Sequence, residues 1–348
     1  MIWNGSLLPP IEMDLFQRVY FFAVYSDFVA FTTPECLNTT RNVLTRTSNF
    51  ALALLEKTYQ NIYNLKNFNM NNNIFPCLWF DGKAKEAANF YCTVFSNSKV
   101  TTDTPMVVQF EIEGKKLMGL NGGPYFTINP SISLFVTCAT NEEIETIYNK
   151  LFEGGKAMMP LNKYSWSEKY AWVVDKFGMT WQLMLGQLPE GGQKIITSFL
   201  FVNELCGKAQ DAMKHYTSIF PNSAIYHSET YKAGEEQPEG NLKFGHFALD
   251  KEMFAAMDGT GNHNFKFNEG LSIMVECETQ EDIDNYWTKL TEGGEESRCG
   301  WLKDKFGVSW QIVPKVLGSL MKDSAKAQRV MAEVMKMKKL DIQTLANA

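Results

Sequence analysis

The chain is short of histidine, of paired cysteines and of long apolar runs. Only four of its 348 residues are histidine, and seven are cysteine, none of them in a Cys-x-x-Cys pair. An odd number of unpaired cysteines argues against a disulfide scaffold, so we expect reduced thiols and a cytoplasmic protein. No apolar stretch reaches the ~18 residues that a membrane helix needs. We therefore expect no membrane partner.

An excess of positive charge is also absent. The formal net charge is −6, so the phosphates of a nucleic acid would be repelled and no nucleic-acid partner is expected. Glycine-rich loops that open a helix, as nucleotide sites require, are missing too, because the pairs Gly154-Gly155 and Gly293-Gly294 follow predicted helices. The composition, with 45% hydrophobic and 21% charged residues, is ordinary for a globular protein.

The chain contains an internal duplication. Residues 82–98 (GKAKEAANFYCTVFSNS) match residues 207–223 (GKAQDAMKHYTSIFPNS). Residues 175–185 (DKFGMTWQLML) match residues 304–314 (DKFGVSWQIVP). Because the matching segments recur in the same order, we infer two copies of one ancestral unit rather than chance similarity.

Each copy shows the pattern strand, helix, strands, and then the same pattern again. Apolar β-type runs alternate with segments whose apolar residues have helical spacing. In the first copy the predicted helices span residues 83–95 and 142–152, and the predicted strands span 74–80, 107–112, 116–120, 132–138, 170–174 and 180–185. The sequence therefore predicts an α+β fold of four βαβββ units.

Outside the two copies lie two further segments. Residues 1–70 are an N-terminal extension, which either includes a helix around 51–63 or does not belong to the natural protein. Residues 72–188 and 194–314 are the two predicted domains. In residues 315–348, Val330, Val334 and Met337 have helical spacing, so we expect a helical tail that packs on the second domain.

Paired βαβββ units with a glycine at the bend before the last strand resemble the vicinal oxygen chelate (VOC) superfamily. That superfamily includes glyoxalases, bleomycin-resistance proteins and extradiol dioxygenases. The strings WLKDKFGVSWQIVP (residues 301–314) and VECETQEDIDNYWTKLTEGG (residues 275–294) resemble its PhnB-like branch, labelled 3-demethylubiquinone-9 3-methyltransferase. The resemblance implies curved mixed sheets, a cup that holds a small molecule, and two domains that pair within one chain, with a homodimer as a further possibility.

The same resemblance implies where a metal would bind. Members of the superfamily hold a divalent ion with His or Gln on a first strand and Glu on a last strand. In this chain the last-strand positions fall on Gln182 and Gln311, and no imidazole stands at the first-strand positions. We therefore expect no cofactor. The alternative is a divalent metal in the second domain, held by His246, His263 and Glu276.

Strand alternation assigns further residues to the expected cup. Met274 and Glu276 share one face of a predicted strand, and Ser309 shares a face with Gln311. Glu276 and Gln311 are the candidate catalytic residues, because a carboxylate in partly apolar surroundings can act as a general base. A solvated carboxylate at the rim is the alternative for Glu276.

Two tryptophans occupy equivalent positions in the copies. Trp172 and Trp301 each stand just before the DKFG bend. They either line a pocket for a planar or apolar ligand, together with Gln182 and His246, or belong to the core. Asp175 and Asp304 within the bends are expected to shape the turns.

These observations predict a PhnB-like protein that binds a small molecule, with unassigned chemistry and without a metal. One alternative is a metal-dependent glyoxalase, dioxygenase or isomerase that uses the second domain. Another is a methyltransferase, although no motif for binding S-adenosylmethionine is present. A third is a module that binds a protein partner and no small ligand. The sequence does not identify the ligand.

Overall fold

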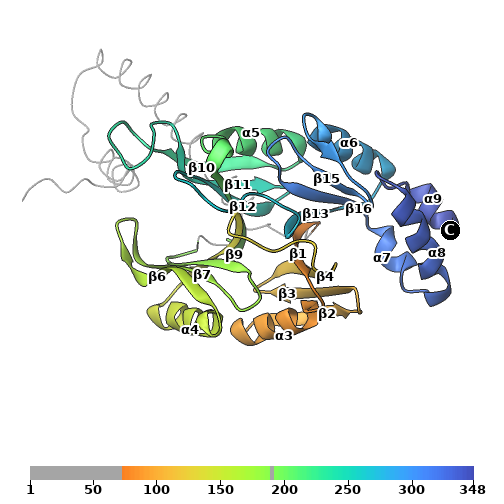
Figure 1. The fold of residues 1–348 in the computed structure, drawn as a ribbon, viewed down its shortest axis with the longest axis horizontal. Helices are drawn as coiled ribbons and strands as arrows, with labels where there is room; N and C mark the ends of the chain where they lie inside the picture. The colour runs from red at the N-terminus through yellow and green to blue at the C-terminus, as the bar shows by residue number, and fades with distance from the viewer. Residues whose placement is uncertain (1–72, 189–191) are drawn as a thin grey trace, which may run out of the picture. The chain divides into compact units, whose positions relative to one another are not determined.

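A computed structural model describes residues 73–188 and 192–348 (Figure 1). These residues belong to one compact unit, Leu65–Ala348. The expected N-terminal extension, residues 1–70, lies outside the described residues. Within the described ranges, no helix is long and apolar enough to cross a membrane.

The first copy contains eight strands and two helices, as two βαβββ units. The helices are α3 (Ala84–Val94) and α4 (Asn141–Phe152). The strands are β1 (Ile74–Phe80), β2 (Ser98–Asp103), β3 (Val107–Ile112), β4 (Lys115–Asn121), β5 (Ile132–Cys138), β6 (Lys156–Tyr164), β7 (Ser167–Val174) and β8 (Thr180–Leu185). Strands β2 and β6 were not predicted. Both lie at sheet edges and are largely exposed, so their sequences lack an apolar pattern.

The second copy repeats this order. A short 3₁₀ turn, η2 (Asn203–Leu205), precedes α5 (Ala209–Ile219), and α6 is Gln280–Thr291. The strands are β9 (Ile195–Val202), β10 (Ala224–Thr230), β11 (Leu242–Leu249), β12 (Glu252–Gly259), β13 (Leu271–Cys277), β14 (Glu295–Glu296), β15 (Trp301–Lys303) and β16 (Ser309–Pro314). The predicted α+β fold of four βαβββ units is confirmed.

The strands form two mixed eight-stranded sheets, and each sheet takes one unit from each copy. Sheet A has the order β14-β15-β16-β13-β1-β4-β3-β2, and sheet B has the order β10-β11-β12-β9-β5-β8-β7-β6. The two units join through antiparallel pairing of β1 with β13 in sheet A and of β5 with β9 in sheet B. Neither copy therefore completes a sheet without the other.

One face of each sheet packs into a common core beneath the helices. Helices α3 and α4 lie next to one another, as do α5 and α6 (Figure 1). The largest core side chains, Trp181, Trp310, Tyr91 and Tyr216, are completely buried. The opposite faces, here called the outer faces, carry separate apolar clusters. Phe75, Cys77, Met118 and Met274 form that of sheet A, and Phe135, Tyr170, Ile196 and Ala255 form that of sheet B.

Buried aspartates fix the bends before the last strands. The Asp304 carboxylate accepts hydrogen bonds from Trp310 Nε1 (2.8 Å), from Tyr216 Oη (2.7 Å) and from the backbone N–H groups of Phe306 and Val308. Gly307 follows with φ of +82°, which glycine adopts without strain. The expectation that these aspartates shape the turns is confirmed. The bend also sets the direction of β16 and hence of Gln311.

A buried ion pair joins the copies between the two sheets. Lys115 begins β4 and Glu252 begins β12, which are equivalent strands. The side chains are only 3% and 4% exposed, and the Lys115 ammonium contacts the Glu252 carboxylate. Gln193 Nε2 also donates to Glu252, at 3.3 Å. Two identical chains would place two lysines or two glutamates at this point, so the pair is specific to the diverged duplication.

The C-terminal segment is helical, as predicted. It forms α7 (Val316–Leu320), α8 (Ser324–Lys336) and α9 (Ile342–Asn347). Its apolar cluster packs against Val313 and Cys299 of the second copy. The backbone N–H of Cys299 donates to the Met337 carbonyl at 2.8 Å. The tail therefore docks at the β15–β16 end of sheet A (Figure 1).

Candidate functional site

The outer face of sheet B has a floor of neutral polar side chains from four neighbouring strands. Gln182 Nε2 donates to Ser133 Oγ at 2.6 Å and lies 3.5 Å from Ser198 Oγ. Tyr170 Oη donates to Gln182 Oε1 at 2.8 Å. The four residues are buried. Their hydrogen bonds hold the Gln182 amide in one orientation.

This donor set does not fit a divalent metal. The positions that the superfamily resemblance implied for ligands do come together, but they carry an amide and two hydroxyls. Burial raises the pKa of Tyr170 well above its usual value of 10, so its phenol stays protonated at neutral pH. Divalent transition metals favour imidazole or deprotonated ligands. Within residues 73–188 and 192–348, no three or more His, Cys, Asp or Glu side chains form a group that could hold a metal.

Sheet A carries a reduced version of the same floor. Gln311 Nε2 donates to Ser272 Oγ at 2.8 Å. Cys77 pairs with Ser272 and stands where sheet B has Ser198. Burial raises the pKa of Cys77 to about 12, so the group is a thiol and not a reactive thiolate. Ser309 Oγ is buried beside this floor without a hydrogen-bond partner among the described residues.

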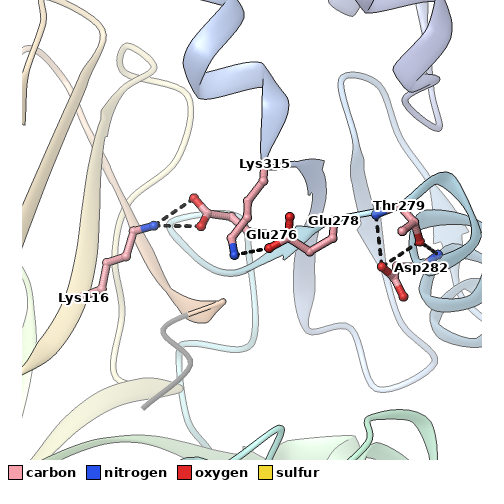
Figure 2. Close-up of polar contacts among 6 residues, drawn as sticks. All are labelled: Lys116, Glu276, Glu278, Thr279, Asp282 and Lys315. Carbon is pink, nitrogen blue, oxygen red and sulfur yellow. Dashed lines mark hydrogen bonds and ion pairs between the residues drawn. The ribbon is translucent and has the colours of Figure 1, made fainter. Parts of the chain in front are cut away.

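Glu276 lies on the outer face of sheet A, but its carboxylate is already paired. Lys116 Nζ is 2.8 and 2.9 Å from its two oxygens, as Figure 2 shows. The same ammonium lies 4.1 Å from the centroid of the Phe75 ring, a cation–π contact. The pair thus bridges β13 and β4 across the intervening strand β1. A general base needs free access to a substrate proton, and here an ammonium occupies that position.

The alternative metal ligands of the second domain do not meet. Glu276 is on β13 of sheet A, whereas His246 is on β11 of sheet B. His263 lies in the loop after β12, with Nε2 3.0 Å from the carbonyl oxygen of Thr260. Asp258 on β12, a further carboxylate of the second copy, accepts hydrogen bonds from the backbone N–H groups of Gly207 and Leu242. The structure gives these groups separate local roles.

The two equivalent tryptophans have different surroundings. Trp172 pairs in register with Gln182 on the outer face of sheet B, and its buried Nε1 has no hydrogen-bond partner among the described residues. Trp301 pairs in register with Gln311, but its ring packs edge-on against Trp79 with centroids 5.9 Å apart. Of the two, Trp172 is the one whose indole N–H is buried without an acceptor among the described residues.

Sheet B is strongly curved around this floor. The rings of Phe135 on β5 and Phe244 on β11 have centroids 5.6 Å apart, although β9 and β12 lie between their strands. The small residues Ser198 and Ala255 stand on those intervening strands and leave room for the contact. The curvature concentrates aromatic surface on this outer face.

The long hairpin of β6 and β7 adds aromatic residues that the sequence analysis did not identify. Tyr164 and Trp166 stack with centroids 5.1 Å apart, and both rings contact that of Tyr170 edge-on. In sheet A the equivalent strands, β14 and β15, have only two and three residues. The first copy is longer than the second between its second helix and its DKFG bend, and this extra length was the feature of the sequence that pointed to the hairpin.

A crevice lies away from both outer faces. It has a volume of about 500 Å³ and lies where α3 ends and α4 begins. Lys194 Nζ reaches into it, 2.6 Å from a Glu143 carboxylate oxygen and 3.4 Å from one of Glu113. Lys194, Glu113 and Glu143 are thus paired with one another within the crevice.

Comparison with known families decides the relationship. The profile described as 3-demethylubiquinone-9 3-methyltransferase matches residues 72–184 and 193–313, that is, both copies. The chain belongs to this family. A PhnB protein of the same description from Bacillus cereus is 36% identical over 32% of this chain and 98% of its own, with a TM-score of 0.31.

Two further solved structures are similar to this chain. A protein from Staphylococcus aureus is 30% identical over 33% of this chain and 97% of its own, with a TM-score of 0.16. Glyoxalase I from Zea mays is 11% identical over 72% of this chain and 95% of its own, with a TM-score of 0.49. A search of curated proteins gave no match.

Proposed function

We propose that this member of the 3-demethylubiquinone-9 3-methyltransferase family binds a small, planar and largely apolar molecule on the outer face of sheet B. The observation that carries the proposal is the indole N–H of Trp172, buried without a partner beside a polar floor. A buried donor without an acceptor costs about 1–3 kcal/mol, which a ligand acceptor would recover. The expected ligand therefore carries a carbonyl or similar oxygen.

The surroundings of Trp172 favour an aromatic ligand. Half-buried apolar side chains, namely Met159, Met184, Phe244 and Met253, pack around the outer-face cluster of sheet B. Aromatic and methionine side chains make favourable contacts with a planar ring. The floor at Gln182 contributes orientation, because its amide is held on both sides by hydrogen bonds.

Sheet A supports this function less well. Its outer face carries the Lys116–Glu276 ion pair, and the C-terminal tail packs on Val313 of the same sheet. Trp301 is engaged with Trp79. We therefore expect one ligand per chain, although the two copies share an ancestor.

We assign no chemical step to the site. The floor groups Gln182, Ser133 and Tyr170 are neutral and hydrogen-bonded to one another, which suits binding and orientation rather than proton abstraction. The family description names a methyl transfer. Neither sheet, as far as it is described, offers the glycine-rich turn after a parallel strand that dinucleotide-type sites use, so the floor alone does not support that activity.

Replacing Trp172 with phenylalanine tests the proposal. A thermal-shift screen of planar aromatic compounds with a carbonyl oxygen first identifies a ligand, and titration calorimetry then measures its affinity. Trp172→Phe keeps a ring but removes the N–H, so we expect a loss of roughly three- to tenfold, the worth of one hydrogen bond. The matched variant Trp301→Phe, at the equivalent position of the other copy, should bind as tightly as the unaltered protein. Equal losses in both variants, or the absence of any ligand in the screen, would count against the proposal.

A further inference from the structure

Two of the four histidines stand directly opposite each other on neighbouring strands. His227 on β10 and His246 on β11 are register partners in an antiparallel pair of sheet B. Directly opposed residues point to the same face, with Cβ atoms about 4.5–5.5 Å apart. Strand β10 is the edge of the sheet, so the pair lies at the margin of the sheet and not over the floor at Gln182.

The surroundings leave the imidazoles available as ligands. His246 Nε2 is buried and has no hydrogen-bond partner among the described residues. Its ring packs edge-on against Phe244, with centroids 4.6 Å apart, which holds it in place. The His227 side chain is about half exposed, and its Nε2 lies 4.0 Å from a carboxylate oxygen of Glu229.

The chemistry of the side chain also suits coordination. A metal ion binds a neutral ring nitrogen, and an imidazole with the ordinary histidine pKa of about 6.5 is largely neutral at pH 7 or above.

We propose that His227 and His246 form a bidentate site for a divalent transition metal such as Cu²⁺, Ni²⁺ or Zn²⁺. Imidazole suits these ions, and Cu²⁺ binds most tightly among them. Water molecules, or Glu229 after a side-chain rotation, would complete the coordination. Two protein ligands make this an open site, in keeping with the absence of any group of three candidate ligands in the described part of the chain.

The first copy provides a natural comparison. The residues equivalent to His227 and His246 are Thr102 on β2 and Gln109 on β3, which are also register partners. Thr102 Oγ1 lies 3.5 Å from Gln109 Oε1. A neutral hydroxyl and amide are poor ligands for these ions, so the proposed site belongs to the second copy alone.

Titration of the full chain with Cu²⁺ alone, followed by electron paramagnetic resonance, tests this proposal. We expect one high-affinity ion whose spectrum shows coupling to two imidazole nitrogens. His227→Gln and His246→Gln should each weaken that binding at least as much as the roughly 10–100-fold that loss of an outer-shell partner costs. His263→Gln serves as the control and should leave it unchanged.

A transplant of the pair keeps the test independent of losses caused by misfolding. The double variant Thr102→His with Gln109→His is expected to bind a second equivalent of Cu²⁺ with the same two-nitrogen spectrum. The proposal is overturned if the two-nitrogen signal persists in His227→Gln, or if the double variant binds no second ion. It does not depend on the proposed function, because Trp172→Phe should retain its copper site.

Discussion

Replacing Lys115 with methionine is expected to lower the free energy of unfolding by about 3–5 kcal/mol, the range measured when one member of a buried ion pair is removed. The variant leaves the Glu252 carboxylate buried between the two sheets, with Gln193 as its remaining described side-chain partner. Urea unfolding monitored by circular dichroism measures the change. A variant as stable as the unaltered chain would show that the pair does not join the copies as described.

A double variant separates the loss of attraction from the cost of an orphaned charge. Lys115→Met with Glu252→Met removes both charges, and replacement of a buried pair by apolar side chains is often close to neutral. We therefore expect most of the stability to return. The exposed pair Lys163–Glu168 is the matched control. Lys163→Ala should change stability by no more than about 1 kcal/mol.

Replacing Asp304 with alanine is the second change with a large expected effect. It removes the acceptor for Trp310 Nε1, for Tyr216 Oη and for the backbone N–H groups of Phe306 and Val308. Each buried donor left without an acceptor costs about 1–3 kcal/mol, and such costs are not additive. We expect a loss of at least about 3 kcal/mol in the free energy of unfolding. A loss below 1 kcal/mol would contradict the anchoring role.

The same residue gives a defined dependence of stability on pH. Burial is the main cause that raises the pKa of Asp304 from 3.8 to about 6, and its hydrogen bonds oppose the shift. The folded state thus keeps this proton at pH values where the unfolded chain has lost it. The contribution to stability is complete below pH 4 and is lost as the pH rises through about 6.

Comparison with Asp304→Asn isolates this contribution, because asparagine does not titrate. Unfolding free energies of both proteins are measured between pH 3.5 and 7. Relative to the variant, the unaltered protein should lose up to about 3 kcal/mol across this range, since each pKa unit corresponds to about 1.4 kcal/mol. Parallel profiles for the two proteins would contradict the raised pKa.

Much of the fold was predictable from the sequence, because each copy shows apolar residues at helical spacing in some segments and β-type apolar runs in others. The helices α3 to α6 and most core strands were predicted from apolar spacing and from the glycines that follow the helices. The edge strands β2 and β6 carry little burial, so their sequences lack that signal and neither was predicted. The copies are mixed by the pairing of β1 with β13 in sheet A and of β5 with β9 in sheet B, long-range contacts that no local pattern encodes.

The candidate site was predictable only in part. The sequence predicted that Gln182 and Gln311 belong to the polar floors, because each follows the glycine of its bend at the same distance along the chain. The partners of Glu276 and His246 were not predictable, since Lys116 and His227 reach them across strands. The difference between Trp172 and Trp301 likewise depends on Trp79, which packs only against the latter.

The methionines of the two outer faces can report directly whether a ligand binds to sheet B. Met159, Met184 and Met253 pack at the outer face of sheet B, whereas Met118 and Met274 belong to that of sheet A. Nuclear magnetic resonance of methyl-labelled methionine, with signals assigned by single Met→Leu variants, follows both sets during titration with a planar aromatic ligand. If the ligand binds to the outer face of sheet B, the signals of the first set shift and those of the second do not. Shifts confined to Met118 and Met274 would contradict it.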